Sequence, residues 1–287
     1  MPATDPPPSP TAQLYRVRFV DTVQRGRAVL REFPDPYPHP RYAIAEAIDA
    51  EKLPPPVWPP EHGDQFHFLF LPGGSATAFE EQKRGEQWMA KPSDPHAEPT
   101  VEIVMRSDRI LWRPGRCMMQ GAADRMQEML LALADFSYHE GELRKLEREI
   151  LADGETLVRD VPLTTAAINK QALRARHHIH ERACTMTGRR IRCARLQRPL
   201  EKPSITLPGA GRRLVSELLV QCEIQDRFKA LDERLEVYED VYELANDRLM
   251  EYGNFRTEAK LEIWIIVILV VEVVLMVAEI VWGLAGK

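Results

Sequence analysis

The chain has 287 residues, a formal net charge of −5 and four cysteines. A chain of this length holds one large folded domain or two small ones. The cysteines form no CxxC pair and have no regular spacing, which argues against a disulfide framework or a zinc ribbon and indicates a reducing compartment.

Residues 1–13 are rich in proline, and we expect them to be disordered. The segment MPATDPPPSP has no apolar run, so it does not resemble a secretory signal peptide. It is also a poor mitochondrial presequence, and we expect no cleavage.

Alternation of apolar and charged residues predicts two strands, LYRVRFV at 14–20 and QFHFLFL at 65–71. TVEIVM and RILW, within 100–112, are expected to add further strands. SATAFEE, at 75–81, is also interpreted as a strand.

Two segments between the first strands look helical, VQRGRAVLREF at 23–33 and RYAIAEAIDA at 41–50. Strands and helices therefore intermix in residues 14–120, which predicts an α+β head domain. For the whole chain we expect an α+β fold: the mixed head, a helical region at 121–213, a long coiled-coil helix at 214–260 and one transmembrane helix at 261–285.

Beyond about Gly121 apolar residues recur at steps of three and four, which predicts an amphipathic helix over 126–150. The segment 162–211 is interrupted by several prolines and glycines. These residues favour short helices and loops there.

Between Lys170 and Arg213 the chain has 12 Lys or Arg and two acids. Arginine runs are typical of surfaces that bind RNA backbone or lipid headgroups, because the guanidinium group pairs well with phosphate. The alternative is a solvated face that pairs with residues 215–262, which contain 13 acids and six bases. The candidate residues for an anionic partner are Arg189, Arg190, Arg192, Arg195 and Arg198.

A zinc site is the other chemistry that this basic segment suggests, through His177, His178, His180, Cys184 and Cys193. Neighbouring arginines would repel a divalent cation and the usual paired ligand spacing is missing, so we expect no metal. The chain also contains no GxxxxGK[ST], HExxH or GxSxG motif. We therefore expect no enzymatic activity, no cofactor and no small-molecule substrate.

The most regular pattern in the chain is a run of apolar residues at alternating steps of four and three. This period of 3.5 predicts a coiled-coil seam. Its partner is either the 126–150 helix of the same chain or the same helix of another subunit. The seam residues are Ile224, Phe228, Leu231, Leu235, Tyr238, Tyr242, Ala245, Leu249 and Tyr252.

Residues 261–285 are long and apolar enough to predict a membrane span. Glu272 and Glu279 lie one heptad apart within it, so both project from one helix face. Because a charged side chain in the hydrocarbon is costly, we expect the two carboxyl groups to meet neighbouring protein, which favours a homo-oligomer. Lining of an ion pathway and exposure of a neutral carboxyl group to lipid are the alternatives.

The tail resembles the C-terminus of the required-for-meiotic-nuclear-division family, whose members end in a conserved helix followed by a membrane segment. Weaker likeness extends upstream to GDQFHFLFLPGG and to LLALADFSYHEGELRKLEREI. The chain departs from the family pattern at PSITLPGAGRR, where members carry a Phe-Trp-Glu cluster. The residues that match the tail are Glu223, Ile224, Arg227, Leu231, Arg234, Leu235, Leu261, Glu262, Trp264, Ile265, Ile266 and Glu272.

The resemblance implies a scaffold that is anchored in the mitochondrial inner membrane and has its soluble domain in the matrix. The alternative location is the nuclear envelope or an endomembrane. It also implies that the protein is an oligomer that supports mitochondrial translation by tethering ribosomes. The oligomer would contact ribosomal protein or the rRNA backbone. The alternative is an oligomeric protein of magnesium or ion transport, with Glu272 and Glu279 near the pathway.

Overall fold

The computed structural model describes residues 12–24, 26–34, 40–49, 64–73, 78–90, 100–165 and 176–285, without the side chains of Ala78, Thr165, Arg256 and residues 277–285. Most of the proline-rich segment predicted to be disordered lies outside these ranges. The chain divides into two compact units. The first contains the residues up to Leu151 together with Arg190–Asp232, and the second contains Ala152–Arg189 and the residues from Glu233 onward.

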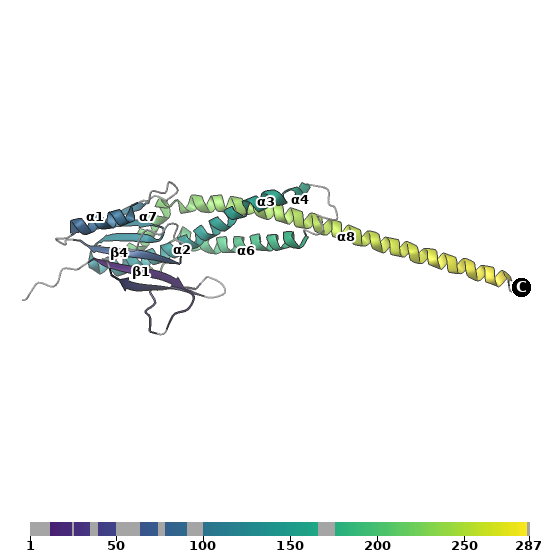
Figure 1. Ribbon diagram of the computed structural model, residues 1–287, viewed down its shortest axis with the longest axis horizontal. Helices are drawn as coiled ribbons and strands as arrows, with labels where there is room; N and C mark the ends of the chain where they lie inside the picture. The colour runs from purple at the N-terminus through teal and green to yellow at the C-terminus, as the bar shows by residue number, and fades with distance from the viewer. Residues whose placement is uncertain are drawn as a thin grey trace, which may run out of the picture. The chain divides into compact units, whose positions relative to one another are not determined.

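A seven-stranded mixed sheet forms the centre of the first unit, with the strand order β2-β3-β1-β4-β7-β6-β5 (Figure 1). Strands β4 and β7 pair in parallel and the other neighbours pair antiparallel. The strands are β1 (Gln13–Val20), β2 (Arg31–Phe33), β3 (Arg41–Ile48), β4 (Gln65–Pro72), β5 (Val101–Met105), β6 (Asp108–Arg113) and β7 (Arg116–Gly121). The α+β class predicted from the sequence is confirmed.

Helix α1 (Ala78–Met89) covers one face of this sheet, and helix α2 (Met126–Ala152) covers the other. On the α1 face, Trp88 and Met89 join a core that includes Leu14 and Met118. Gly85 permits the close approach of α1, since a Cβ there would overlap the Met118 sulfur. On the α2 face, Tyr138 packs against the sheet side chain of Phe19, and Phe136 packs against that of Trp112.

Three sequence predictions in the head domain are wrong. The segments expected to be helical contain β2 and β3, and SATAFEE contributes its described residues to helix α1. Alanine and glutamate favour helices, but β3 pairs with β1 from Tyr42 to Ile48, so tertiary pairing overrides intrinsic propensity. The predicted strands at 14–20, 65–71 and within 100–112 are confirmed.

The elements that follow the sheet along the described chain are all helices. After α2 come α3 (Gly154–Asp160), α4 (Pro162–Thr165), α6 (Arg176–Glu201), α7 (Gly209–Gln221) and α8 (Ile224–Ala285), and a short 3-10 helix, η1 (Ala123–Arg125), precedes α2. The predicted helix at 126–150 is confirmed, whereas short helices and loops were expected where α6 extends over 26 residues. The expected single helix from residue 214 is broken, because Glu223 adopts a φ of 51° between α7 and α8.

The second unit has an apolar core of its own, built from α3, α6 and α8. Leu157 from α3 and Ile179 and Met186 from α6 pack with Tyr242 and Leu249 of α8. The seam of α8 is therefore covered here by helices of the same chain. The structure does not show the coiled coil that was predicted.

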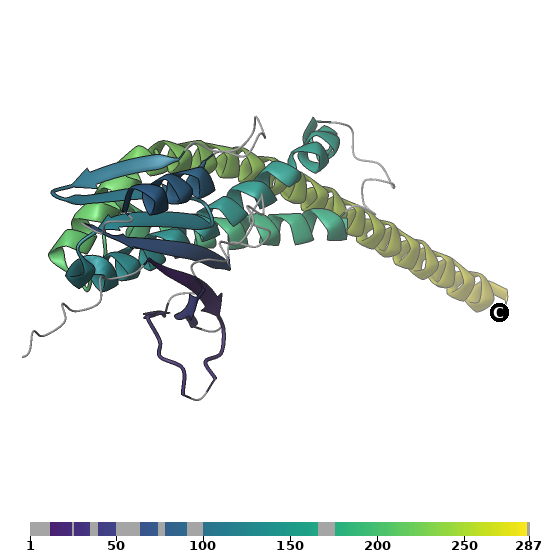
Figure 2. The same ribbon diagram turned by 60° about the vertical axis from the view of Figure 1, so that its left-hand side comes forward.

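Helix α8 continues without a break to Ala285, as Figures 1 and 2 show in yellow. From Ile263 to Met276 every large apolar side chain is between 45% and 65% exposed. Over the part of the chain whose side chains are described, no helix is long and apolar enough to cross a membrane. Those side chains end at Met276.

Candidate functional site

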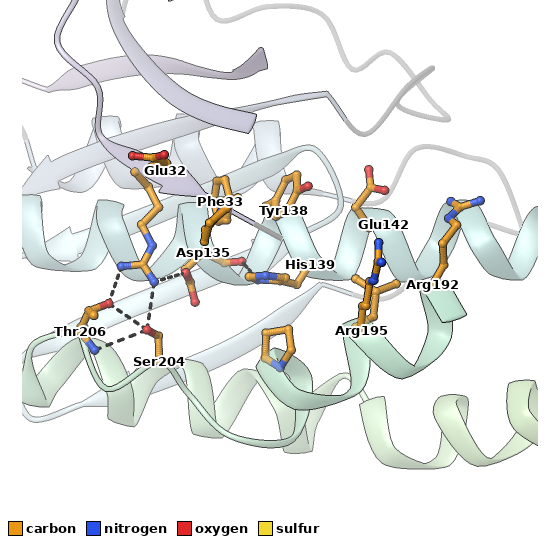
Figure 3. Close-up of a pocket in the computed structure, with 14 residues that line it drawn as sticks. Glu32, Phe33, Asp135, Tyr138, His139, Glu142, Arg192, Arg195, Ser204 and Thr206 are labelled. Carbon is orange, nitrogen blue, oxygen red and sulfur yellow. Dashed lines mark hydrogen bonds and ion pairs between the residues drawn. The ribbon is translucent and has the colours of Figure 1, made fainter. Parts of the chain in front are cut away.

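A cavity of about 500 Å³ lies within the first unit. Its walls come from the edge strand β2, the middle of α2, the last turns of α6 and the turn between α6 and α7 (Figure 3). This volume is within the range of about 300–1,000 Å³ typical of small-ligand pockets. The lining residues are Arg31, Glu32, Phe33, Pro34, Asp135, Tyr138, His139, Glu142, Arg192, Arg195, Leu196, Pro199, Ser204 and Thr206.

Arg31 lines the cavity and connects three of its walls. Its Nη1 donates to Thr206 Oγ1 at 2.6 Å, and its Nη2 donates to Ser204 Oγ at 3.0 Å (Figure 3). Nη2 also lies 2.8 Å from Asp135 Oδ1, and Asp135 is only 2% exposed. A buried carboxylate needs such a partner. Through these contacts Arg31 connects β2 to both α2 and the turn between α6 and α7.

An aromatic wall forms the side of the cavity next to β2. The rings of Phe33 and Tyr138 stack at a centroid distance of 4.0 Å, and His139 meets Phe33 edge-on at 5.5 Å. The Nδ1 of His139 lies 2.8 Å from the backbone oxygen of Asp135, so in a neutral ring this nitrogen carries the proton. Burial, followed by the charge of Glu142, raises the pKa of Tyr138 well above its usual value. The phenol is therefore neutral at physiological pH.

Charged side chains from α2 and α6 also line the cavity. Glu142 Oε1 accepts from Lys145 Nζ at 2.8 Å, and Arg192 Nη1 lies 2.8 Å from Glu149 Oε2. Arg195 is exposed and has no hydrogen-bond or ion-pair partner among the described residues. In Figure 3 its side chain extends from α6 toward the Glu142 side of the cavity. Among the described lining residues, the cavity therefore offers an aromatic wall, the guanidinium group of Arg195 and the carboxylate of Glu32, and neither of these two charged groups has a charged partner.

The five arginines predicted to bind an anionic partner differ in their contacts within the described part of the chain. Arg189 pairs with Asp153 in the second unit. In the first unit Arg190 lies 3.6 Å from Asp232, and Arg192 pairs with Glu149. Arg195 and Arg198 are exposed and have no acidic partner in the described part of the chain. Of the predicted cluster, only these two project freely from α6.

The predicted seam residues are mostly buried inside the chain itself. Phe228 and Tyr238 are half-buried, and Phe228 lines a second cavity of about 420 Å³ in the first unit. Tyr242 donates to Asp160 Oδ2 at 3.2 Å. Burial, followed by the charge of Asp160 and this hydrogen bond, raises the pKa of the Tyr242 phenol to about 12. The buried members are Ile224, Leu231, Leu235, Tyr242, Ala245 and Leu249.

The remaining candidate residues lie apart from the cavity. Glu272 is exposed on α8, and the side chain of Glu279 lies outside the described residues. On α6, His180 Nε2 lies 3.8 Å from Cys184 Sγ, and His178 Nε2 lies 3.2 Å from Asp160 Oδ2. Within the described ranges no group of three potential ligands gathers around a metal position.

An ion-pair network between α2 and α8 was missed by the sequence interpretation. Arg227 at the start of α8 donates to Glu140 at 3.0 Å and to Glu147 at 2.7 Å and 2.9 Å. Burial alone would lower the pKa of Arg227, but these carboxylates outweigh it and raise the pKa. The signal in the sequence was the seven-residue spacing of the two acids, which places both on one helix face.

Comparison with known proteins adds no assignment. The chain matches no protein-family model, and no curated protein matches it significantly. The resemblance of the tail to the required-for-meiotic-nuclear-division family therefore stays a prediction.

Proposed function

We propose that this protein is a non-enzymatic module anchored to a membrane by the end of α8. The observation that carries the proposal is the exposure of 13 successive apolar side chains, interrupted only by Glu272, from Ile263 to Met276. They surround the whole helix and do not form a single stripe. A partner helix would cover one stripe only, whereas lipid covers every side.

The free energies of transfer favour a lipid environment for this segment despite its two glutamates. Transfer of 13 large apolar side chains out of water is worth on the order of 20 kcal/mol. A carboxylate in the hydrocarbon costs about 3 kcal/mol on insertion scales, so Glu272 and Glu279 together cost about 6 kcal/mol, which is still well below this gain. The helix from Ile263 to Ala285 has 23 residues, and at about 1.5 Å per residue it is long enough for a hydrocarbon core of roughly 30 Å.

Alkaline extraction of membranes tests the anchor. We expect the full chain to stay in the membrane pellet, and the double variant Val267→Lys, Val274→Lys to be released. The matched control is Val237→Lys, Leu244→Lys, because these side chains are also exposed, lie seven residues apart and belong to the same helix. Release of the wild-type chain, or equal release of both variants, would contradict the anchor.

The resemblance extends the proposal to the mitochondrial inner membrane and to ribosome tethering by an oligomer. The free side chains of Arg195 and Arg198 on α6 support contact with an anionic partner such as rRNA backbone. In co-sedimentation with mitochondrial ribosomes, Arg195→Glu, Arg198→Glu should abolish binding. Arg212→Glu, Arg213→Glu, an equal charge reversal at exposed positions of α7, should leave binding unchanged. Unchanged binding of the α6 variant would refute this contact.

A further inference from the structure

A row of basic side chains crosses the sheet of the first unit on the face that α1 covers. Arg16 of β1 lies opposite His67 of β4, His67 opposite Arg116 of β7, and Arg116 opposite Arg113 of β6. Residues that pair laterally point to the same side of a sheet, so these four side chains share one face.

The neighbouring row on the same face is apolar, which makes the basic row exceptional. Leu14, Leu69, Met118 and Leu111 pair laterally two residues away, and all four belong to the core beneath α1. On this face of the sheet, an apolar row and a basic row are therefore only two residues apart along each strand. Like charges placed side by side on a sheet are destabilising, so the basic row needs a reason.

Capping of α1 explains part of the row. Arg116 Nη1 donates to the carbonyl of Trp88 at 2.6 Å. Arg113 Nη1 donates to the carbonyls of Met89 at 3.2 Å and Ala90 at 3.1 Å. Cations at the C-terminal end of a helix are stabilising because they satisfy its last carbonyl groups. This role uses one nitrogen of each guanidinium group and neither Arg16 nor His67.

Arg16, His67 and Arg116 each have one nitrogen atom without a hydrogen-bond partner among the described residues. Arg16 Nε, His67 Nε2 and Arg116 Nη2 are buried and have no hydrogen bond within the described part of the chain. Arg116 as a whole is only 6% exposed. The acid at the end of the row, Glu46 opposite Arg16, already accepts a hydrogen bond from Arg27. Buried donors without acceptors are rare in native proteins, and each suggests a missing ligand or ordered water.

The electrostatics of the row agree with a missing anion. Burial, together with the charges of Arg16 and Arg116, lowers the pKa of His67 to about 4. Burial, together with the charge of Arg113, lowers the pKa of Arg116 to about 10. Both shifts mean that positive charge in this row is destabilised, and an anion would reverse that effect.

We propose that Arg16, His67 and Arg116 bind a phosphate group on the α1 face of the sheet. A guanidinium group donates to phosphate oxygens in a planar fork, and a neutral imidazole with its proton on Nε2 donates one more hydrogen bond. This site lies in the α+β unit and is independent of the membrane anchor, so failure of either proposal leaves the other standing.

Calorimetric titration of the full chain in detergent with inorganic phosphate tests the site. We expect saturable binding, weakened at least about tenfold by Arg16→Gln or by His67→Gln, since each removes a hydrogen bond to a charged group. The matched control is Arg18→Gln, which removes the same charge from an exposed position on the same strand and face. Arg116→Gln is not used because this residue also caps α1.

Histidine nuclear magnetic resonance gives a second readout, with the His67 signal assigned by its loss in His67→Gln. Phosphate should raise the pKa of His67 from about 4. Methyl phosphate in place of phosphate distinguishes an esterified phosphate group from the free ion. Absence of saturable binding, an equal loss in Arg18→Gln or an unmoved pKa of His67 would each overturn the proposal.

Discussion

At the scale of single residues, Arg31 holds the candidate cavity together. Its guanidinium group contacts Ser204 and Thr206 in one turn and Asp135 in α2, residues separated by up to 175 positions in the sequence. The side chain of Asp135 is 3% exposed and that of Arg31 is 18% exposed. Removal of one partner from such a pair leaves the other charge buried without compensation.

Asp135→Asn should therefore lower the free energy of unfolding by roughly 3 kcal/mol, the usual cost of breaking a buried ion pair. Urea denaturation of the full chain in detergent measures this change. Glu32→Gln is the control, because Glu32 lines the same cavity but is exposed. Equal stabilities of the two variants would show that the ion pair does not hold the cavity together.

His67 should make stability depend on pH. Its pKa is lowered from 6.5 to about 4 in the folded chain, so between these values the unfolded chain binds more protons. The free energy of unfolding should therefore fall as the pH decreases from about 6.5 to about 4 and show no further loss from this group below that.

The measurement for His67 is the denaturation midpoint as a function of pH in a buffer without phosphate. His67→Gln should flatten the profile over this interval relative to the wild-type chain. A wild-type slope that persists unchanged in the variant would assign the dependence to other groups.

At the scale of elements, aromatic alternation predicted β1 and β4 correctly, because Phe and Val at every second position fit a half-buried strand in any context. The alanines and glutamate of β3 carry no such signal, and only its pairing with β1 makes it a strand. Helix α6 tolerates Gly188 and has Pro199 in its last turns, although both residues predicted interruption.

The candidate cavity lay beyond sequence interpretation for the same reason. Its walls combine β2, α2, the end of α6 and a turn, and nothing local connects Arg31 with Thr206. The basic segment was recognised by composition alone. Composition did not distinguish Arg192, which pairs with Glu149, from Arg195, which has no acidic partner in the described ranges.

The seam of α8 allows a matched test of intramolecular packing. Leu249 is fully buried in the core shared with α3 and α6, whereas Leu244 in the same helix is 52% exposed. Leu249→Ala should destabilise the second unit by at least about 2 kcal/mol, and Leu244→Ala should have little effect. Hydrogen exchange at the backbone amides of α3 reports the change, and equal exchange in both variants would contradict burial of the seam within the chain.

At the scale of the whole molecule, helix α8 has two kinds of apolar surface. Toward its N-terminal end α8 buries a stripe against helices of its own chain, and beyond Leu261 it exposes apolar side chains on all sides. Sequence periodicity distinguished these two parts, since one has a period of 3.5 residues and the other has none. The sequence did not show that the stripe is covered within the chain.

Flotation of the purified full chain with phospholipid vesicles tests the membrane anchor most directly, because no other protein is present to hold it. The account predicts that the wild-type chain and Val237→Lys, Leu244→Lys rise with the vesicles, while Val267→Lys, Val274→Lys stays at the bottom of the gradient. A wild-type chain that remains soluble without detergent and does not float would contradict the account.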